Sequence, residues 1–524
     1  MSQQPPSAVS RILLENPPLP WYQDYGALKL YVPLSAGVLL VSATNGYEAS
    51  MLNGLQALDT FQNFFHPNVA LTGLINSTYW IGAVIAFPIA PFVADRWGRR
   101  WAVILSTWIM MVGAALQGSA KNMGMFVTAR ILLGLAATCA GNCGPPMVAE
   151  LAHPRDRKFL TALYSGLYYI GAIMAAWITY GTFRLNSTYG WRIPSYLQGV
   201  VALFNLIGII FCPESPRYLI AKDRRDEAHA ILANAHSNGD KTDPLILAEV
   251  DEISLAITRE IEQGLDWKEF FVSPVHRKRL FLLVFIGTAM NWSGNGLVSY
   301  YLSAVLDTVG ISSQKEQTLI NGILHIVSFF TCVVASWATN WVARRTQFLT
   351  STIVMFISFL SVTVANSLIA KDADNKAASV AVLFFIFLFM CGYNWAFNAL
   401  SFAYPVEFLP YSVRVLGVGF LKLFCNLAGF FNTWVNPVGL ANIGWRYYIV
   451  YVVWLAVEFL VVYFTFPETL GYALEEVTAV LDNNPLISFR HRKLRGNVGQ
   501  STICDEESSA SDPDPEVIVQ AAKA

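Results

Sequence analysis

Two ionisable residues of opposite charge, Glu48 and Arg130, lie inside long apolar stretches of this chain. A charged side chain in the hydrocarbon of a bilayer is costly, and it therefore marks a functional site by default. A buried carboxylate holds a proton more tightly than an exposed one, so Glu48 has the chemistry of a proton acceptor. The competing interpretation is a permanent structural role for both charges.

A second group of charged residues occurs twice, half a chain apart. Each copy contains two motifs. One is a Pro-Glu-Ser or Pro-Glu-Thr sequence at the end of an apolar run. The other is a Glu followed seven residues later by an Arg, with a Pro between them. A run of basic residues precedes both in each copy. A duplicated unit of this size is typical of a secondary transporter built from two similar halves around a central site. The copies are Asp95–Arg100, Glu150–Arg157 and Pro213–Arg217, repeated as Asn340–Arg345, Glu407–Arg414 and Pro467–Gly471.

The repeated charges lie at the ends of the apolar runs, where Arg and Glu can form charge-assisted hydrogen bonds. We expect such bonds between the halves to hold the cytoplasmic side shut and to break when the carrier opens inward. The alternative is a set of static loop ion pairs. The expected gate comprises Asp95, Arg99, Arg100, Glu150, Arg157, Glu214, Arg217, Arg344, Arg345, Glu407, Arg414 and Glu468.

The composition is that of a membrane protein, with 54% hydrophobic and only 14% charged residues in 524. Soluble domains carry roughly 25% charged residues. The net charge of −1 implies no nucleic-acid partner. Apolar runs of about 20 residues can cross a bilayer, and they predict an all-α protein with twelve transmembrane helices in two pseudo-symmetric halves. The expected spans are 30–57, 69–93, 101–119, 123–148, 159–181, 194–212, 280–308, 317–339, 348–368, 378–408, 413–435 and 445–466.

Lys and Arg are concentrated in the loops on one side of these spans, which places both termini and the central loop in the cytoplasm. We expect the N-terminal segment 1–29 to be cytoplasmic, 30–213 and 280–466 to be the six-helix halves, and 467–524 to be a mostly disordered cytoplasmic tail. In the loop 214–279 we expect an amphipathic helix, because apolar residues recur at three- and four-residue spacing. These are Leu247, Val250, Ile253, Ile257 and Ile261. Asn186 falls on the outer side in an Asn-Ser-Thr sequence and is the expected glycosylation site.

Several motifs resemble the sugar porter family of the major facilitator superfamily. The sequence from Pro213 to Leu219 is close to diagnostic of that family, and Arg130 with Gly134 matches its fourth span. The stretches 292–301 and 432–437 resemble most the fungal lactose-permease-like branch. The resemblance covers about 30–482 and implies twelve helices that move one solute by alternating access.

The resemblance also assigns roles to Glu48 and Arg130. In proton-coupled members a carboxylate at this place pairs with the Arg of the fourth span; the family residue is Asp, and Glu48 is one methylene longer. Protonation of Glu48 would then release Arg130. A structural ion pair in a facilitator remains the alternative.

The residues that would hold a sugar depart from the family pattern. Matching by motif position gives Ser165, Met290, Asn291, Gly296 and Phe402, of which only Asn291 keeps an amide and Phe402 an aromatic face. Asn295 and Asn426 are expected to supply replacement hydrogen bonds. Any single Asn here could equally serve helix packing. His325 and Lys422 are polar residues within spans for which the sequence alone assigns no role.

The sequence therefore predicts a monomeric plasma-membrane carrier that moves a sugar with protons. A carrier or exporter of a non-sugar solute, such as a polyol, a quinate-like acid or a secondary metabolite, is the alternative within transport. A non-transporting nutrient sensor on the same fold is the alternative outside it. No enzymatic activity, cofactor or metal is expected.

Overall fold

The computed structural model describes residues 12, 22–470, 477 and 481, except 264–267, 340, 373–374 and 411–412. Every regular element in these residues is helical, and ten segments are long and apolar enough to span a membrane. They amount to twelve spans, because α8 adds one and the segment Leu416–Thr465 contains two helices that meet at Gly444. The predicted all-α, twelve-helix fold is confirmed. Most of the predicted segments 1–29 and 467–524 lies outside the described residues.

The first six spans are joined by short turns whose polar residues cap the helices. Asn68 and Asn122 each accept a hydrogen bond from the backbone N–H three residues later, at 2.8 and 2.9 Å. Gly98, with φ of +100°, forms the turn between the second and third spans. The helices are α2 (Tyr25–Leu34), the π-helix η1 (Ser35–Leu39), α3 (Leu40–Gln56), α4 (Asp59–Phe65), α5 (Val69–Trp97), α6 (Arg99–Gly118), α7 (Met123–Leu151), α8 (Arg157–Thr182) and α9 (Tyr189–Phe211).

The last six spans include two that are interrupted. Gly294, with φ of +106°, separates two helices of the seventh span, and a π-helix lies within the tenth. The helices are α14 (Pro274–Trp292), α15 (Asn295–Thr308), α16 (Gln314–Ala338), α17 (Arg344–Ile369), α18 (Lys376–Tyr393), η2 (Asn394–Asn398), α19 (Ala403–Phe408), α20 (Arg414–Ile443), the short η4 (Gly444–Arg446) and α21 (Tyr447–Thr465).

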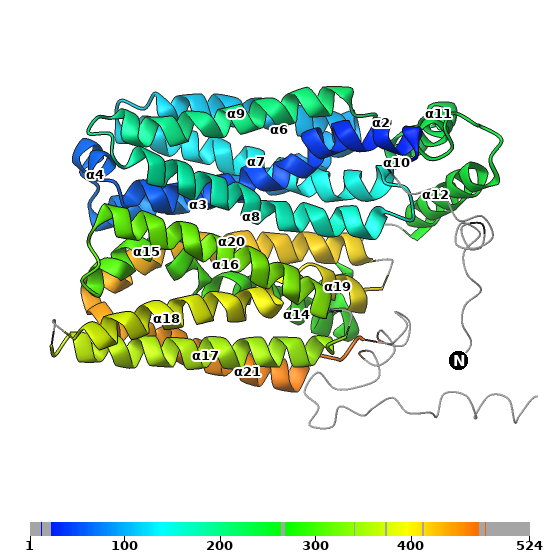
Figure 1. Ribbon diagram of the computed structural model, residues 1–524. Coiled ribbons are helices and arrows are strands. Elements are labelled where there is room, and N and C mark those ends of the chain that lie inside the picture. Colours follow the sequence, from blue (N-terminus) through cyan, green and yellow to red (C-terminus); the bar gives the residue numbers. More distant parts are fainter. Residues whose placement is uncertain are drawn as a thin grey trace, which may run out of the picture. The chain divides into compact units, whose positions relative to one another are not determined.

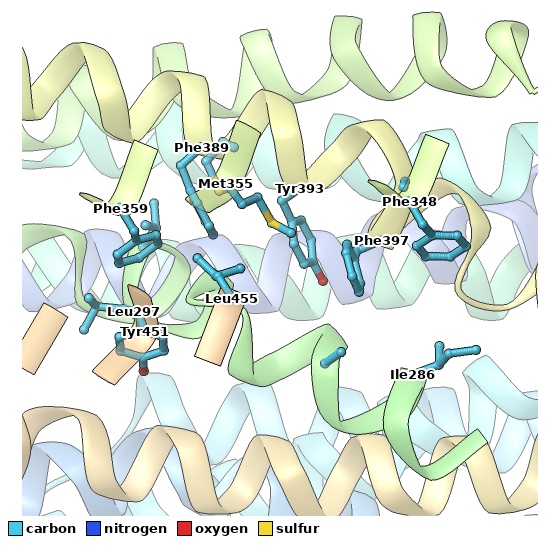
Figure 2. Close-up of a cluster of buried hydrophobic side chains, with 14 of the residues drawn as sticks. Ile286, Leu297, Phe348, Met355, Phe359, Phe389, Tyr393, Phe397, Tyr451 and Leu455 are labelled. Atoms are coloured by element: carbon cyan, nitrogen blue, oxygen red, sulfur yellow. The ribbon is translucent and has the colours of Figure 1, made fainter. Parts of the chain in front are cut away.

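The two sets of spans lie side by side, as Figure 1 shows. Contacts between them run mainly through α5 with α20, α8 with α16, and α3 with α15. The second set has its own apolar core, in which Phe359 and Phe389 meet edge to face at 4.6 Å beside Tyr451 (Figure 2). Large apolar side chains such as Phe211, Trp337 and Phe384 are exposed, as expected for helices that face lipid.

Short helices of the central loop lie beyond one end of the spans (Figure 1). They are α10 (Pro216–Ala221), α11 (Arg225–His236), α12 (Pro244–Gln263) and α13 (Glu269–Val272). The amphipathic helix expected here is α12, and its buried face packs Ile246 and Val250 against Leu232 of α11. Leu247, predicted on that face, is instead 49% exposed, because the helix turns Ile246 inward. α11 contacts α2 and α10 contacts α7, so these two helices rest on the first half, whereas α13 contacts α14 of the second half.

Candidate functional site

A buried ion pair lies at the centre of the first half. Arg130 of α7 donates from Nη1 to Glu48 Oε1 of α3, and both side chains are 1% exposed. The two charges are thereby removed from lipid and from water together. Removal of one partner from such a pair strongly destabilises the folded protein, because the other charge is left buried and uncompensated.

Two further residues complete the surroundings of this pair. Gln198 of α9 donates from Nε2 to Glu48 Oε2 at 2.6 Å, and the Arg130 guanidinium lies 5.5 Å from the ring centroid of Tyr79 on α5. Four helices therefore converge on the ion pair. Sequence reasoning missed Gln198 and Tyr79; a polar Gln inside an apolar span was the available signal for the first.

The residues predicted to bind the solute have several different environments. Asn291 donates to the Cys425 carbonyl at 2.9 Å, and Asn426 donates to the Ala83 carbonyl of the other half at 3.3 Å. Asn295 accepts from Ser299 Oγ at 2.8 Å, and Phe402 is 44% exposed. Ser165 lies in α8, and its side chain is outside the described residues. Asn291 and Asn426 thus make the contacts expected of helix packing.

Polar contacts also join the halves near the middle and at the end of the spans beside α4. Tyr169 of α8 donates to Asn394 Oδ1 of η2 and accepts from Asn398 at 2.7 Å. Nearer α4, Asn53 donates to Asn321 Oδ1 at 3.1 Å, and a small cavity borders both residues. These neutral hydrogen bonds contribute to holding the halves together, and they can exchange at low cost as the halves move.

At the opposite end, called the motif end because it carries the repeated charges, the first half forms a compact network. Glu214 Oε1 accepts from the backbone N–H of Arg100 at 3.1 Å, at the start of α6. Arg99 Nε lies 3.4 Å from Glu150 Oε2, which also accepts from Ser215. Burial raises the pKa of Glu214, although backbone N–H donors at the N-terminus of α6 oppose this rise.

The second half repeats this network residue by residue. Glu468 Oε2 accepts from the backbone N–H of Arg345 at 3.1 Å, at the start of α17. Arg344 Nε lies 3.2 Å from Glu407 Oε1, and Glu407 Oε2 accepts from Thr469. The adjacent Arg345 donates to the Tyr463 carbonyl at 2.6 Å, as Arg100 donates to the Ile210 carbonyl at 2.6 Å.

The other gate residues take varied positions at the motif end. Asp95 lies 4.0 Å from Arg99 but is 78% exposed, and Arg157 lies 3.9 Å from Glu249 of α12. Arg414 donates to the Leu409 carbonyl at 3.4 Å, and Arg217 is in α10. The bonds described above for the gate residues do not join the two halves. The expected bonds between the halves are not among them and stay a prediction.

Comparison with known proteins identifies relatives over most of the chain. The family model described as sugar (and other) transporter matches residues 35–481. The MFS-type transporter criB of Aspergillus cristatus is 26% identical over 87% of this chain and 95% of that protein. The hexose transporter HXT13 of Saccharomyces cerevisiae is 29% identical over 86% and 82%. Among solved structures, an inward-open xylose transporter XylE from E. coli matches with a TM-score of 0.70 at 19% identity, covering 86% of this chain and 99% of that one.

Proposed function

Because this chain belongs to the sugar (and other) transporter family, we propose that it carries a saccharide across the plasma membrane by alternating access, in symport with protons. The observation that carries the proton part is the buried pair of Glu48 and Arg130. Relatives described as hexose transporters, and a structural relative described as a proton:xylose symporter, support the choice of substrate and of coupling ion.

The ion pair supplies a two-state element for coupling. With Glu48 ionised, Arg130 and Gln198 both hold its carboxylate, and the two charges cancel. When a proton binds Glu48, the attraction to Arg130 falls, and the guanidinium is free to seek other acceptors. Proton binding would thereby loosen the contact between α3 and α7 and favour one of two arrangements of the halves.

The motif end is the cytoplasmic side in this proposal, which puts both termini and the central loop inside the cell. The repeated networks then brace the cytoplasmic ends of each half, while the contacts between halves open and close around the solute. Asn186 is exposed in the loop between α8 and α9, so its side chain is accessible for glycosylation on the outer side. The solute lies among Asn291, Asn295, Phe402, Asn426 and Ser165.

Uptake in a yeast that lacks its own sugar carriers tests the proposal. Labelled mono- and disaccharides should accumulate against a gradient, and a protonophore should abolish the accumulation. The Glu48→Gln variant should reach the membrane and still exchange labelled solute, but it should no longer concentrate it. Accumulation by Glu48→Gln equal to that of the parent would disprove proton coupling through this pair.

A non-sugar solute is the second candidate, favoured by two observations. Asn291 and Asn426 donate to backbone carbonyls, so their amides are engaged by the helices themselves. The relatives criB and oryC are described only as MFS-type transporters. If no saccharide competes for uptake in the same assay and Asn291→Ala changes nothing, this candidate becomes the leading account.

A further inference from the structure

Lys422 places a positive charge where the two halves meet. It lies on α20, and its Nζ donates to Asn142 Oδ1 at 2.6 Å and lies 3.5 Å from the Gly141 carbonyl oxygen, both on α7 of the other half. Lys422 belongs to none of the ion pairs in the described part of the chain. Its visible partners are thus neutral oxygens, unlike those of Arg130, which has Glu48 as its counter-ion.

The surroundings of Lys422 are polar and incompletely hydrogen-bonded. A Cβ placed on Gly141 would lie 3.5 Å from Asn45 Nδ2, and one placed on Gly144 would lie 3.1 Å from the Tyr164 hydroxyl. Asn45 Oδ1 and the Tyr164 hydroxyl are buried and have no hydrogen-bond partner. Buried polar atoms are normally paired, so these unpaired atoms, next to the same stretch of α7 that Lys422 contacts, indicate a place for a polar ligand.

An aromatic ring completes this group. The Nζ of Lys422 lies 5.9 Å from the ring centroid of Phe402, which is 44% exposed. Lys422, Asn142, Asn45, Tyr164 and Phe402 thus come from five different spans of both halves. A site shared in this way can open to either side as the halves move, as alternating access requires.

We propose that the solute bound here is a hydroxylated carboxylate, such as a sugar acid, and that Lys422 binds its carboxylate. This inference rests on the proposed transport function and narrows its substrate class. An ammonium within a membrane protein is costly when only neutral groups surround it, and an anionic ligand supplies the missing counter-charge. The hydroxyls of the ligand would meet Asn45 and Tyr164, and its apolar face would cover Phe402.

A purely structural role for Lys422 makes a different prediction. If the ammonium only joins α20 to α7 through Asn142, its removal should weaken the binding of charged and neutral solutes alike. If it binds a carboxylate, its removal should weaken only the charged ones. The decisive quantity is therefore the ratio of two affinities, which a general loss of folded protein does not change.

The test uses the full chain in lipid nanodiscs and isothermal titration with D-glucose, D-glucuronate and quinate at pH 7. Glucose and glucuronate differ only at C6, where glucuronate carries the carboxylate. We expect the parent to bind glucuronate or quinate at least ten-fold more tightly than glucose. Lys422→Gln should reduce that preference to less than two-fold, and Lys422→Arg should retain most of it. Lys376→Gln, which removes an exposed lysine at the start of α18, should leave the ratio unchanged.

Each outcome decides a specific part of the inference. Binding of glucose without preference for either acid overturns the role of Lys422 and leaves the saccharide proposal intact. Lys422-dependent binding of quinate alone supports the role of Lys422 and refutes the saccharide. A preference for acids that persists in Lys422→Gln overturns the assignment of the carboxylate to this residue. Binding of none of the three overturns the role of Lys422, while the saccharide proposal stands or falls with the uptake assay.

Discussion

The two halves of this carrier are alike at the motif end and unlike in the middle of the membrane. At the motif end, Glu214 and Glu468 each cap the start of a helix through the backbone N–H of an Arg. In the middle, the first half contains the ion pair of Glu48 and Arg130. The second half contains the buried Glu458, which accepts from Ser293 and Trp454 and forms none of the ion pairs among the described residues.

This difference separates two requirements of a transporter with two related halves. Bracing the helix ends is a mechanical need that both halves share, and the same residues meet it twice. Binding a proton and a solute needs only one site, so the middle of each half is free to change. The chemistry specific to this protein is therefore expected where the halves differ, at Glu48, Arg130, Lys422 and their neighbours.

The largest loss of stability is expected from removing the buried ion pair, which among the described residues belongs to the first half alone. Arg130→Ala leaves the Glu48 carboxylate buried without a cation, which costs about 3–5 kcal/mol. Glu48→Gln should be milder, because its amide oxygen can still accept from Arg130. Thermal melting of the purified variants should rank parent, Glu48→Gln and Arg130→Ala in that order. Melting temperatures of both variants equal to that of the parent would contradict the view that the ion pair stabilises the centre.

The next-largest effect, on transport rate, tests whether the charge networks at the motif end have the same function in both halves. Arg99→Ala and Arg344→Ala each remove the guanidinium that faces Glu150 or Glu407. Each should lower the turnover by about ten-fold, or about 1.4 kcal/mol in the barrier, at normal surface levels. Arg446→Ala, at an exposed residue of η4, is the matched control and should transport normally. Slower transport in only one of the two variants would mean that the ends are alike in structure but not in function.

A smaller effect, on stability, should distinguish the turn before α6 from the turn before α17. Gly98 has φ of +100°, and a Cβ added to it would overlap the Glu214 carboxylate. The corresponding residue before α17 is Ala343, with φ of −56°. Gly98→Ala should destabilise the protein by about 1–2 kcal/mol, whereas Ala343→Gly should cost less than about 1 kcal/mol. Melting curves of the two variants measure this asymmetry, and equal losses of stability would contradict it.

The last effect appears only on acidification, and it concerns the region where helices of the central loop rest on the first half. Burial, with the nearby His236, lowers the pKa of His153 to about 4, so His153 is neutral in the folded protein at pH 7. The unfolded chain takes up a proton near pH 6.5, so the associated stability is present above that pH and is lost as the pH falls towards 4. The titratable and charged groups around His153 are Tyr31, Arg155, Asp156, His236 and Glu249.

Replacement of His153 by Asn should remove this part of the acid sensitivity. Between pH 7 and pH 5 the parent should lose on the order of 1–2 kcal/mol more than His153→Asn. Melting temperatures measured at both values compare the two proteins. An identical drop in parent and variant would assign the acid sensitivity to other groups.

Much of this architecture could be predicted from the sequence, because apolar run length directly reports a span. The spans expected at 69–93 and 123–148 are the helices Val69–Trp97 and Met123–Leu151. The pairing of Glu48 with Arg130 could be inferred from the resemblance and from two opposite charges in a membrane. The partner of a neutral polar residue could not, because an amide such as Gln198 fits many environments. The partners of Arg99 and Arg344 were equally undetermined, since charges at helix ends can bond within or between halves.

The π-helix η1 has a consequence for the first span as a whole. Each residue of an α-helix turns the chain by about 100°, and a π-helical turn accommodates one extra residue. Tyr31, before η1, donates to Asp156 at 2.8 Å, and Glu48, after it, faces Arg130. Deletion of one residue from Ser35–Leu39 would rotate these two side chains relative to each other, so only one contact could survive. The extra residue of the π-helix thus sets how Glu48 is rotated about the helix axis relative to Tyr31 at the start of the span.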